Sequence, residues 1–177
     1  LDFFDFESRV SSFARLAAYY PPGFTLTGGD QAERVSGARA RSGIFDVLGV
    51  QPALGRGFLL AEDRAGAPPV AVISHALWTR RYHGDRGAVG QPIVLSGRPY
   101  TLVGVLPEAF YSPAMWPRMP EIWVPLGLDP NVGRRDARML RVIGRLRPDV
   151  TVDQARAELN VVANALAIEY PDTNKGT

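Results

Sequence analysis

The chain has 177 residues, of which 46% are hydrophobic and 21% are charged, so it can build one large domain or two small lobes and is not intrinsically disordered. The formal net charge is only +2, and Lys175 is the single lysine among 20 basic residues. The sequence has no cysteine, and its apolar runs are far shorter than the roughly 20 residues of a transmembrane helix, which excludes a disulfide scaffold and a membrane span.

The first part of the chain is expected to alternate strands with short helices. Apolar residues at helical spacing predict an amphipathic helix over 3–15, with Asp2 capping its first turn. Strands are predicted at 16–20, at 24–27 and, as an exposed strand, at 33–41. Ser42 is expected to cap a short helix that Gly49 ends.

The rest of the chain carries clearer local signals. After a loop over 51–63, a strand at 69–73 leads to a helix that begins at Ser74 and ends near Gly84. The predicted strands that follow are a hairpin of 92–95 and 100–105 across Ser96-Gly97-Arg98, then 121–126 and 140–147. Thr151 and Gln154 form a capping box at the start of the last helix.

This order of strands and helices lacks a Rossmann-like alternation and predicts an open α+β fold. The middle of the chain is expected to form a lobe of its own, inserted between two halves of another lobe.

No constellation of residues predicts catalysis. His75 and His83 fall at the two ends of one helix, about 12 Å apart at the helical rise, and cannot share a metal ion. Ser74 is interpreted as a helix cap, because no base lies opposite it and no nucleophile elbow surrounds it. The adjacent carboxylates Glu62 and Asp63 are interpreted as a solvated turn, and Gly55-Arg56-Gly57 as a tight turn.

A group of arginines raises the question of nucleic-acid binding, which the sequence does not favour. Aromatic residues for base stacking are not interleaved with them, and no nucleic-acid-binding motif is present. Strand alternation places Arg141, Arg145 and Arg147 on one polar face.

One irregular, proline-rich segment over 106–120 carries large apolar side chains with no helical or strand period. These residues are candidates for contact with a partner: Phe110, Tyr111, Met115, Trp116 and Met119. The alternative, held equally open, is that the segment folds back over a lobe and caps its core.

Several sequence runs, in their order along the chain, carry a resemblance to a known family. The runs are Gly37-Ala38-Arg39, Ile44 to Phe58, Val70 to Trp78, Ile93 to Val105 and Ile122 to Leu126. The series resembles the MacB-like periplasmic core domain of ABC-transporter permeases of the FtsX-like type.

The resemblance implies a porter-like lobe of βαβ units built from the chain ends, residues 1–49 and 129–177, with an inserted α/β lobe over 50–128. It implies an extracytoplasmic domain of an inner-membrane protein, without catalytic residues, cofactor or metal. The implied partners are the protein's own transmembrane helices, an ABC ATPase and a periplasmic adaptor protein, but no nucleic acid.

The resemblance further implies a dimer in the full-length permease, whereas the isolated domain is expected to be monomeric. The alternative function is a free-standing periplasmic ligand-binding or sensor domain; a hydrolase is disfavoured because no acid–base or nucleophile group is assembled.

Overall fold

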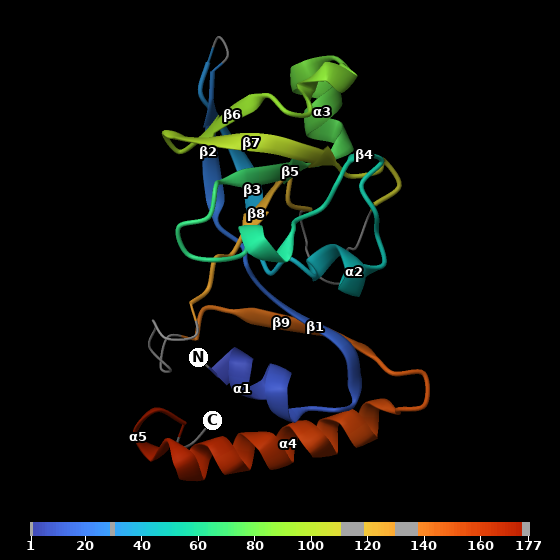
Figure 1. Cartoon of the computed structure of the whole chain (residues 1–177), viewed down its shortest axis with the longest axis vertical. Coiled ribbons are helices and arrows are strands. Elements are labelled where there is room, and N and C mark those ends of the chain that lie inside the picture. The colour runs from blue at the N-terminus through green and yellow to red at the C-terminus, as the bar shows by residue number, and fades with distance from the viewer. Residues whose placement is uncertain (1, 29–30, 111–118, 130–137, 175–177) are drawn as a thin grey trace.

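The computed structural model describes residues 2–28, 31–110, 119–129 and 138–174, and shows helices packed around a mixed sheet of nine strands (Figure 1). The strands are β1 (Phe13–Tyr20), β2 (Gly23–Thr27), β3 (Glu33–Ala40), β4 (Leu54–Gly55), β5 (Val70–Ile73), β6 (Pro92–Leu95), β7 (Arg98–Val105), β8 (Ile122–Pro125) and β9 (Arg141–Leu146). The helices are α1 (Asp2–Arg9), α2 (Ile44–Leu48), α3 (His75–Tyr82), α4 (Val152–Glu169) and α5 (Pro171–Asn174), with 3₁₀ turns η1 (Leu60–Glu62) and η2 (Arg86–Ala88).

Six of the strands close into a ring, so the predicted mixture of α and β is confirmed but the sheet is not open. β2 pairs with β6, β6 with β7, β7 with β5, β5 with β8, β8 with β3, and β3 pairs back with β2. We call this ring the barrel. Closing the ring gives these strands neighbours on both sides, which removes the exposed sheet edges that favour aggregation.

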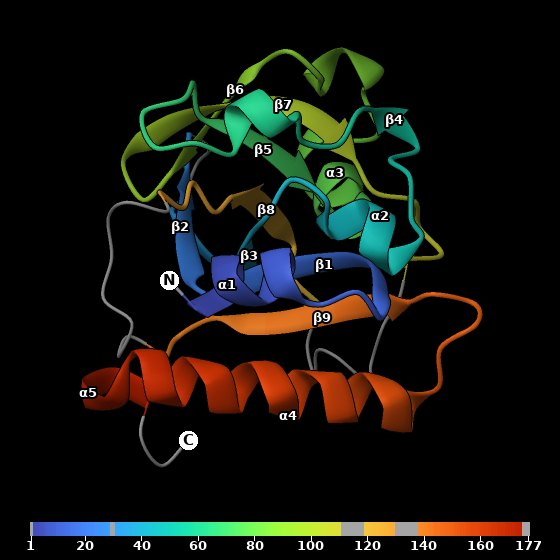
Figure 2. The ribbon, with the colours of Figure 1, turned by 60° about the horizontal axis from the view of Figure 1, so that its bottom comes forward.

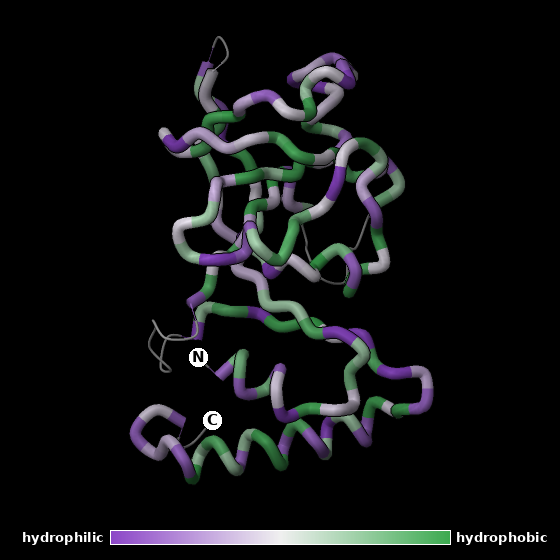
Figure 3. The backbone as a smooth tube through the Cα atoms, viewed as in Figure 1, coloured by the Kyte–Doolittle hydropathy of each residue, from purple (hydrophilic) through white to green (hydrophobic). Residues whose placement is uncertain are grey.

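The interior of the barrel is filled by apolar side chains from all six strands. They are Phe24, Leu26, Val35, Ala71, Ile73, Ile93, Leu95, Tyr100, Leu102, Val105, Ile122 and Val124. Helix α3 lies at the end of the barrel where β5 and β7 finish, and its Leu77 is fully buried among them. In Figure 3 the central strands of this part are mostly hydrophobic, as a packed interior requires.

A second core lies outside the barrel wall, under α2. Trp123 of β8 is fully buried there, with its ring centroid 5.6 Å from that of Phe45. Phe58 packs on Phe45 from the loop before η1, at 5.3 Å between ring centroids. β3, β8, β5 and β7 therefore each have apolar side chains on both faces.

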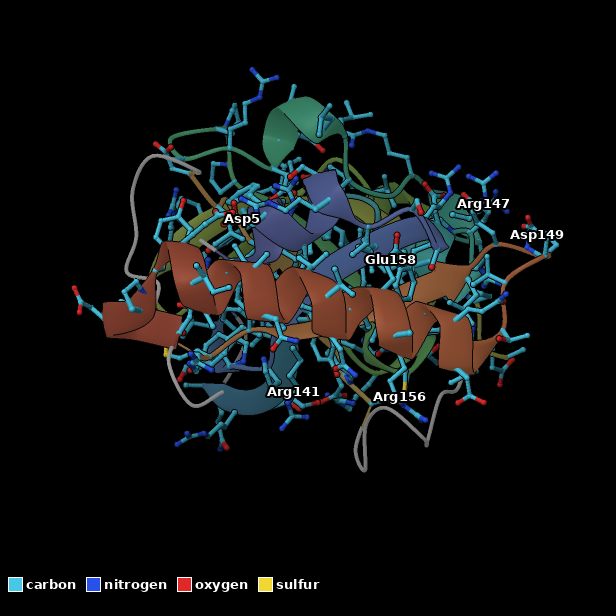
Figure 4. The ribbon with its side chains drawn as sticks, turned by 90° about the horizontal axis from the view of Figure 1, so that it is seen from below. Asp5, Arg141, Arg147, Asp149, Arg156 and Glu158 are labelled. Atoms are coloured by element: carbon cyan, nitrogen blue, oxygen red, sulfur yellow. The ribbon has the colours of Figure 1, made fainter. Side chains whose placement is uncertain are left out.

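The sheet continues from β3 through β1 to β9, and α1 and α4 cover this part on the side away from the barrel (Figures 1 and 2). Ala155, Val162 and Leu166 form the buried stripe of α4. Glu158 accepts hydrogen bonds from the backbone N–H of Ser11 at 2.8 Å and of Ser12 at 2.9 Å. Figure 4 shows Glu158 on the side of α4 that faces α1.

Two predictions are wrong: the extent of the first helix and the exposure of β3. The helix predicted over 3–15 ends at Arg9, because the next backbone N–H groups at Ser11 and Ser12 bind Glu158 and the chain enters β1 at Phe13. β3 is not exposed: Ala38 and Ala40 have no accessible surface, since β3 lies between β8 and β1 in the sheet.

The clearest local signals are confirmed. The Ser74 hydroxyl accepts a hydrogen bond from the Leu77 N–H, and Thr151 and Gln154 form the predicted capping box. Gly49 ends α2 in the left-handed region at a φ of 70°. Ser42 does not cap α2; the cap position belongs to Gly43.

The division into lobes at residues 49/50 and 128/129 stays a prediction. β2 and β3, from the first segment, are hydrogen bonded to β6 and β8 of the proposed insert, so one sheet runs through both.

Candidate contact groove

A groove of about 690 Å³ lies beside the start of α3, between α3 and described residues that follow β7 and precede β8. We call it the α3 groove. Its lining residues are Ser74, His75, Ala76, Thr79, Arg80, Leu106, Pro107, Glu108, Phe110, Met119, Pro120 and Glu121. The lining is mainly apolar, with charged groups at its rim.

Two of the five residues predicted to contact a partner, Phe110 and Met119, line this groove. Both are partly buried and pack against the core under α2. The Phe110 ring lies 6.4 Å from that of Trp123, and the Met119 carbonyl accepts a hydrogen bond from the Ser36 hydroxyl at 2.9 Å. Each residue thus has one side in the core and the other toward the groove.

The other three predicted contact residues, Tyr111, Met115 and Trp116, lie outside the described residues. The contact role of the five therefore stays a prediction.

Arg80 forms two ion pairs at the charged rim of the α3 groove. Its guanidinium binds Glu33 of β3 at 2.6 Å and Glu121 at 2.9 Å, and the hydrogen bond with Glu121 raises the pKa of Arg80. The pair with Glu121 fixes the segment just before β8 against α3. These ion pairs could not be predicted from local sequence patterns, because the three residues are far apart in the chain.

The hydroxyl group of Ser74 and the imidazole group of His75, which line the groove, make contacts that stabilise α3. The Ser74 hydroxyl is engaged as the cap of α3, and the His75 ring packs edge-on against Trp78 at 5.3 Å between centroids. His83 occupies the other end of α3, in the left-handed region at a φ of 52°. Within the described residues no cluster of three or more His, Asp or Glu side chains could hold a metal ion.

The carboxylates of Glu62 and Asp63 do not form a solvated turn, and that interpretation is wrong. The Asp63 side chain has no accessible surface and accepts hydrogen bonds from the backbone N–H of Ser42 and of Gly127, both at 2.9 Å. Arg41 pairs with it at 3.1 Å. Glu62 binds the Arg56 guanidinium through both oxygens, at 2.6 and 2.8 Å.

The arginines of the last strand also differ from expectation. Arg145 does not only face solvent: its guanidinium donates to the carbonyl of Val47, in the last turn of α2, at 2.8 Å. A cation at this position stabilises the carbonyl end of a helix.

Known proteins share the sequence pattern and the fold of this chain. The family profile of the MacB-like periplasmic core domain matches residues 2–162. The chain belongs to this family. Its members are domains of ABC-transporter permeases, so the resemblance inferred from the sequence is confirmed.

Solved structures of the family share the fold. The periplasmic region of MacB from Actinobacillus actinomycetemcomitans superposes with a TM-score of 0.68 at 14% identity, covering 94% of this chain and 72% of that one. The extracellular domain of the noncanonic ABC-type transporter YknZ from Gram-positive bacteria gives 0.67 at 16% identity, covering 97% and 84%. No curated protein matches the sequence.

None of the helices within the described residues has the length and apolarity needed to cross a membrane.

Proposed function

We propose that the chain is the extracytoplasmic module of a permease of the inner membrane, and that it transmits motions driven by cytoplasmic ATP hydrolysis to a substrate or partner protein. It has no catalytic chemistry of its own. Its partners are the transmembrane helices of the same protein, an ABC ATPase and a periplasmic adaptor, and the intact permease works as a dimer.

The observation that carries the proposal is that one sheet joins the part covered by α1 and α4 to the barrel. The Asn174 amide donates a hydrogen bond to the Asp2 carboxylate at 3.1 Å. At the other end of α1, Arg9 binds both carboxylate oxygens of Glu169 in α4, at 2.7 and 2.8 Å. These contacts join α1 to α4 and α5, so the helices of this part of the molecule are held to one another.

The continuous sheet supports a mechanical role. The ends belong to the part covered by α1 and α4, and β1 joins that part to β3 of the barrel through the pairs Tyr19–Ala40 and Tyr20–Arg39. Backbone ladders and close-packed cores transmit displacement because they deform little. A movement applied to the part covered by α1 and α4 would reach the barrel through this ladder.

The α3 groove is the surface at which we place partner contact. It is apolar, it lies on the barrel away from the chain ends, and two of the predicted contact residues line it. Ala76 and Thr79 are exposed on its α3 side, so they can be enlarged without disturbing either core.

The test uses the full-length permease with its ATPase. Ala76→Arg together with Thr79→Arg should abolish transport while leaving the melting temperature of the 177-residue domain unchanged. Thr25→Arg, an exposed position on β2 outside the groove, is the matched control and should transport normally. Normal transport by the double variant would contradict the placement of the contact.

The location is tested separately. Because the 177 residues contain no cysteine, one introduced at exposed Val161 of α4 can be labelled selectively in this domain. A membrane-impermeant maleimide should label it in spheroplasts whose inner membrane is intact. Labelling only after lysis would place the domain in the cytoplasm and refute the proposal.

A further inference from the structure

The end of the barrel opposite α3 carries a small polar pocket that the proposed function does not use. Its volume is about 200 Å³, and it is lined where β3 and β8 end and where β5 and β7 begin. We call it the barrel mouth. The mouths of β-barrels are a common place for small-molecule sites, because the strands leave an opening that short loops surround.

Three arginines line the barrel mouth: Arg39 from the end of β3, Arg98 from the start of β7, and Arg64 from the loop after η1. Two of them are held by aromatic residues of the barrel interior. The Arg39 guanidinium lies 5.8 Å from the centroid of the Phe24 ring, and that of Arg98 lies 5.7 Å from the centroid of the Tyr100 ring. Stacking of this kind fixes a guanidinium and leaves its N–H groups available at the edge.

No carboxylate of the described residues forms an ion pair with the three arginines of the barrel mouth. None of their carboxylate oxygens lies within 4.0 Å of the guanidiniums of Arg39, Arg64 or Arg98. Glu62 also lines the pocket, but both its oxygens are taken by Arg56, and one also accepts the backbone N–H of Leu59 at 2.8 Å. Gathering like charges without a counter-ion is unfavourable, which favours an anion from outside the domain.

From this arrangement we infer that the barrel mouth binds a phosphate group. Three guanidiniums match the charge of roughly −1.5 to −2 of a phosphate monoester better than the single charge of a carboxylate. Guanidinium N–H pairs also fit phosphate oxygens in bidentate geometry. The pocket has room for one phosphate and a small substituent.

The first experiment is a calorimetric titration of the domain with inorganic phosphate at constant ionic strength, with acetate as the competing anion. We expect saturable binding that acetate does not displace at equal concentration. Arg64→Gln with Arg98→Gln should weaken binding by roughly tenfold or more, the effect of losing charge-assisted hydrogen bonds. Arg98→Lys should weaken it too, because lysine keeps the charge but not the fork of donors.

The control removes the same charge elsewhere. Arg86→Gln with Arg156→Gln, in η2 and on α4, should change the affinity by less than about twofold, because distant exposed charges are screened. Circular dichroism spectra and melting temperatures establish that every variant is folded. Absence of saturable phosphate binding would overturn the inference. Equal affinity for acetate, or full affinity in the Arg64→Gln/Arg98→Gln variant, would do the same.

Two further titrations identify the source of the phosphate. Glycerol phosphate represents a soluble monoester, and phosphatidylcholine vesicles with and without phosphatidic acid represent a lipid headgroup. Binding of glycerol phosphate alone assigns a soluble compound. Binding only to vesicles that contain phosphatidic acid, lost in the Arg64→Gln/Arg98→Gln variant, assigns a lipid.

Discussion

The buried carboxylate of Asp63 should be among the most sensitive side chains of the domain. It joins three segments that are distant in sequence: the corner after β3 through Arg41 and Ser42, the end of η1, and the chain after β8 through Gly127. Asp63→Asn keeps the shape of the side chain but removes its charge and replaces one acceptor oxygen with a donor.

The expected loss follows from these contacts. Asparagine must turn its amide N–H₂ toward either the Gly127 N–H or the donors at Ser42 and Arg41, so at least one buried donor loses its acceptor. Arg41, whose side chain is only 15% exposed, also loses its buried ion-pair partner. Breaking a buried pair by removing one partner costs about 3–5 kcal/mol. For a domain of this size, that lowers the melting temperature by about 10 °C.

The assay is chemical unfolding followed by circular dichroism, with the same substitution at an exposed aspartate as the control. Asp153 pairs with Arg156 at 3.0 Å but is 90% exposed, so Asp153→Asn should cost less than about 1 kcal/mol. The denaturant slope should be similar in both variants, because the folded state is the same. If Asp63→Asn is no more destabilising than Asp153→Asn, the argument from burial and hydrogen bonding is wrong.

Two further predictions concern packing and pH. A Cβ at Gly37 would overlap the Phe24 ring inside the barrel, so Gly37→Ala should cost about 1–3 kcal/mol, whereas Gly43→Ala, with nothing within 4 Å, should be nearly neutral in the same unfolding assay. Hydrogen bonds from Ser11 and Ser12 lower the pKa of Glu158 to about 2, from 4.5 unperturbed. Its contribution to stability is therefore present above the unfolded pKa and lost as the pH falls toward 2. Glu158→Gln should lower the melting temperature at neutral pH and flatten its fall below about pH 5; an unchanged acid profile would contradict this.

Elements with a local cause could be predicted from the sequence. The Ser74 cap, the Thr151–Gln154 capping box and the Gly49 helix end each depend on neighbouring residues, which the sequence shows directly. The turn at Ser96-Gly97 is similar: both residues have positive φ, at 50° and 80°, as a tight hairpin turn requires.

Closure of the barrel could not be predicted in this way. It depends on β2 pairing with β6, through Leu26 with Leu95 and Thr27 with Val94, and no local pattern marks partners so far apart. Asp63 was misjudged for the same reason. A carboxylate in a loop rich in Gly and Pro is usually solvated, and the donors that bury this one come from residues 41, 42 and 127.

The two candidate sites differ in the same way: residues of the α3 groove could be predicted from the sequence, and the barrel mouth could not. Phe110 and Met119 could be singled out because large apolar residues in an irregular segment are unusual, and both line the α3 groove. The barrel mouth could not be found from the sequence. Its arginines come from residues 39, 64 and 98, which are distant in sequence. The end of β3 meets the start of β7 because β3 pairs parallel with β8, β8 antiparallel with β5, and β5 parallel with β7.

The same region connects the two parts of the molecule. β1 is hydrogen bonded to the barrel at the end of β3, through the pairs Tyr19–Ala40 and Tyr20–Arg39 and the hydrogen bond from the Arg41 N–H to the Ala18 carbonyl at 2.9 Å. Arg39 lines the barrel mouth and Arg41 pairs with Asp63. A phosphate bound at the mouth would therefore touch the strand through which, under the proposed function, displacement of the part covered by α1 and α4 reaches the barrel. Arg39 then belongs both to the lining of the mouth and to the strand pairing that joins the two parts.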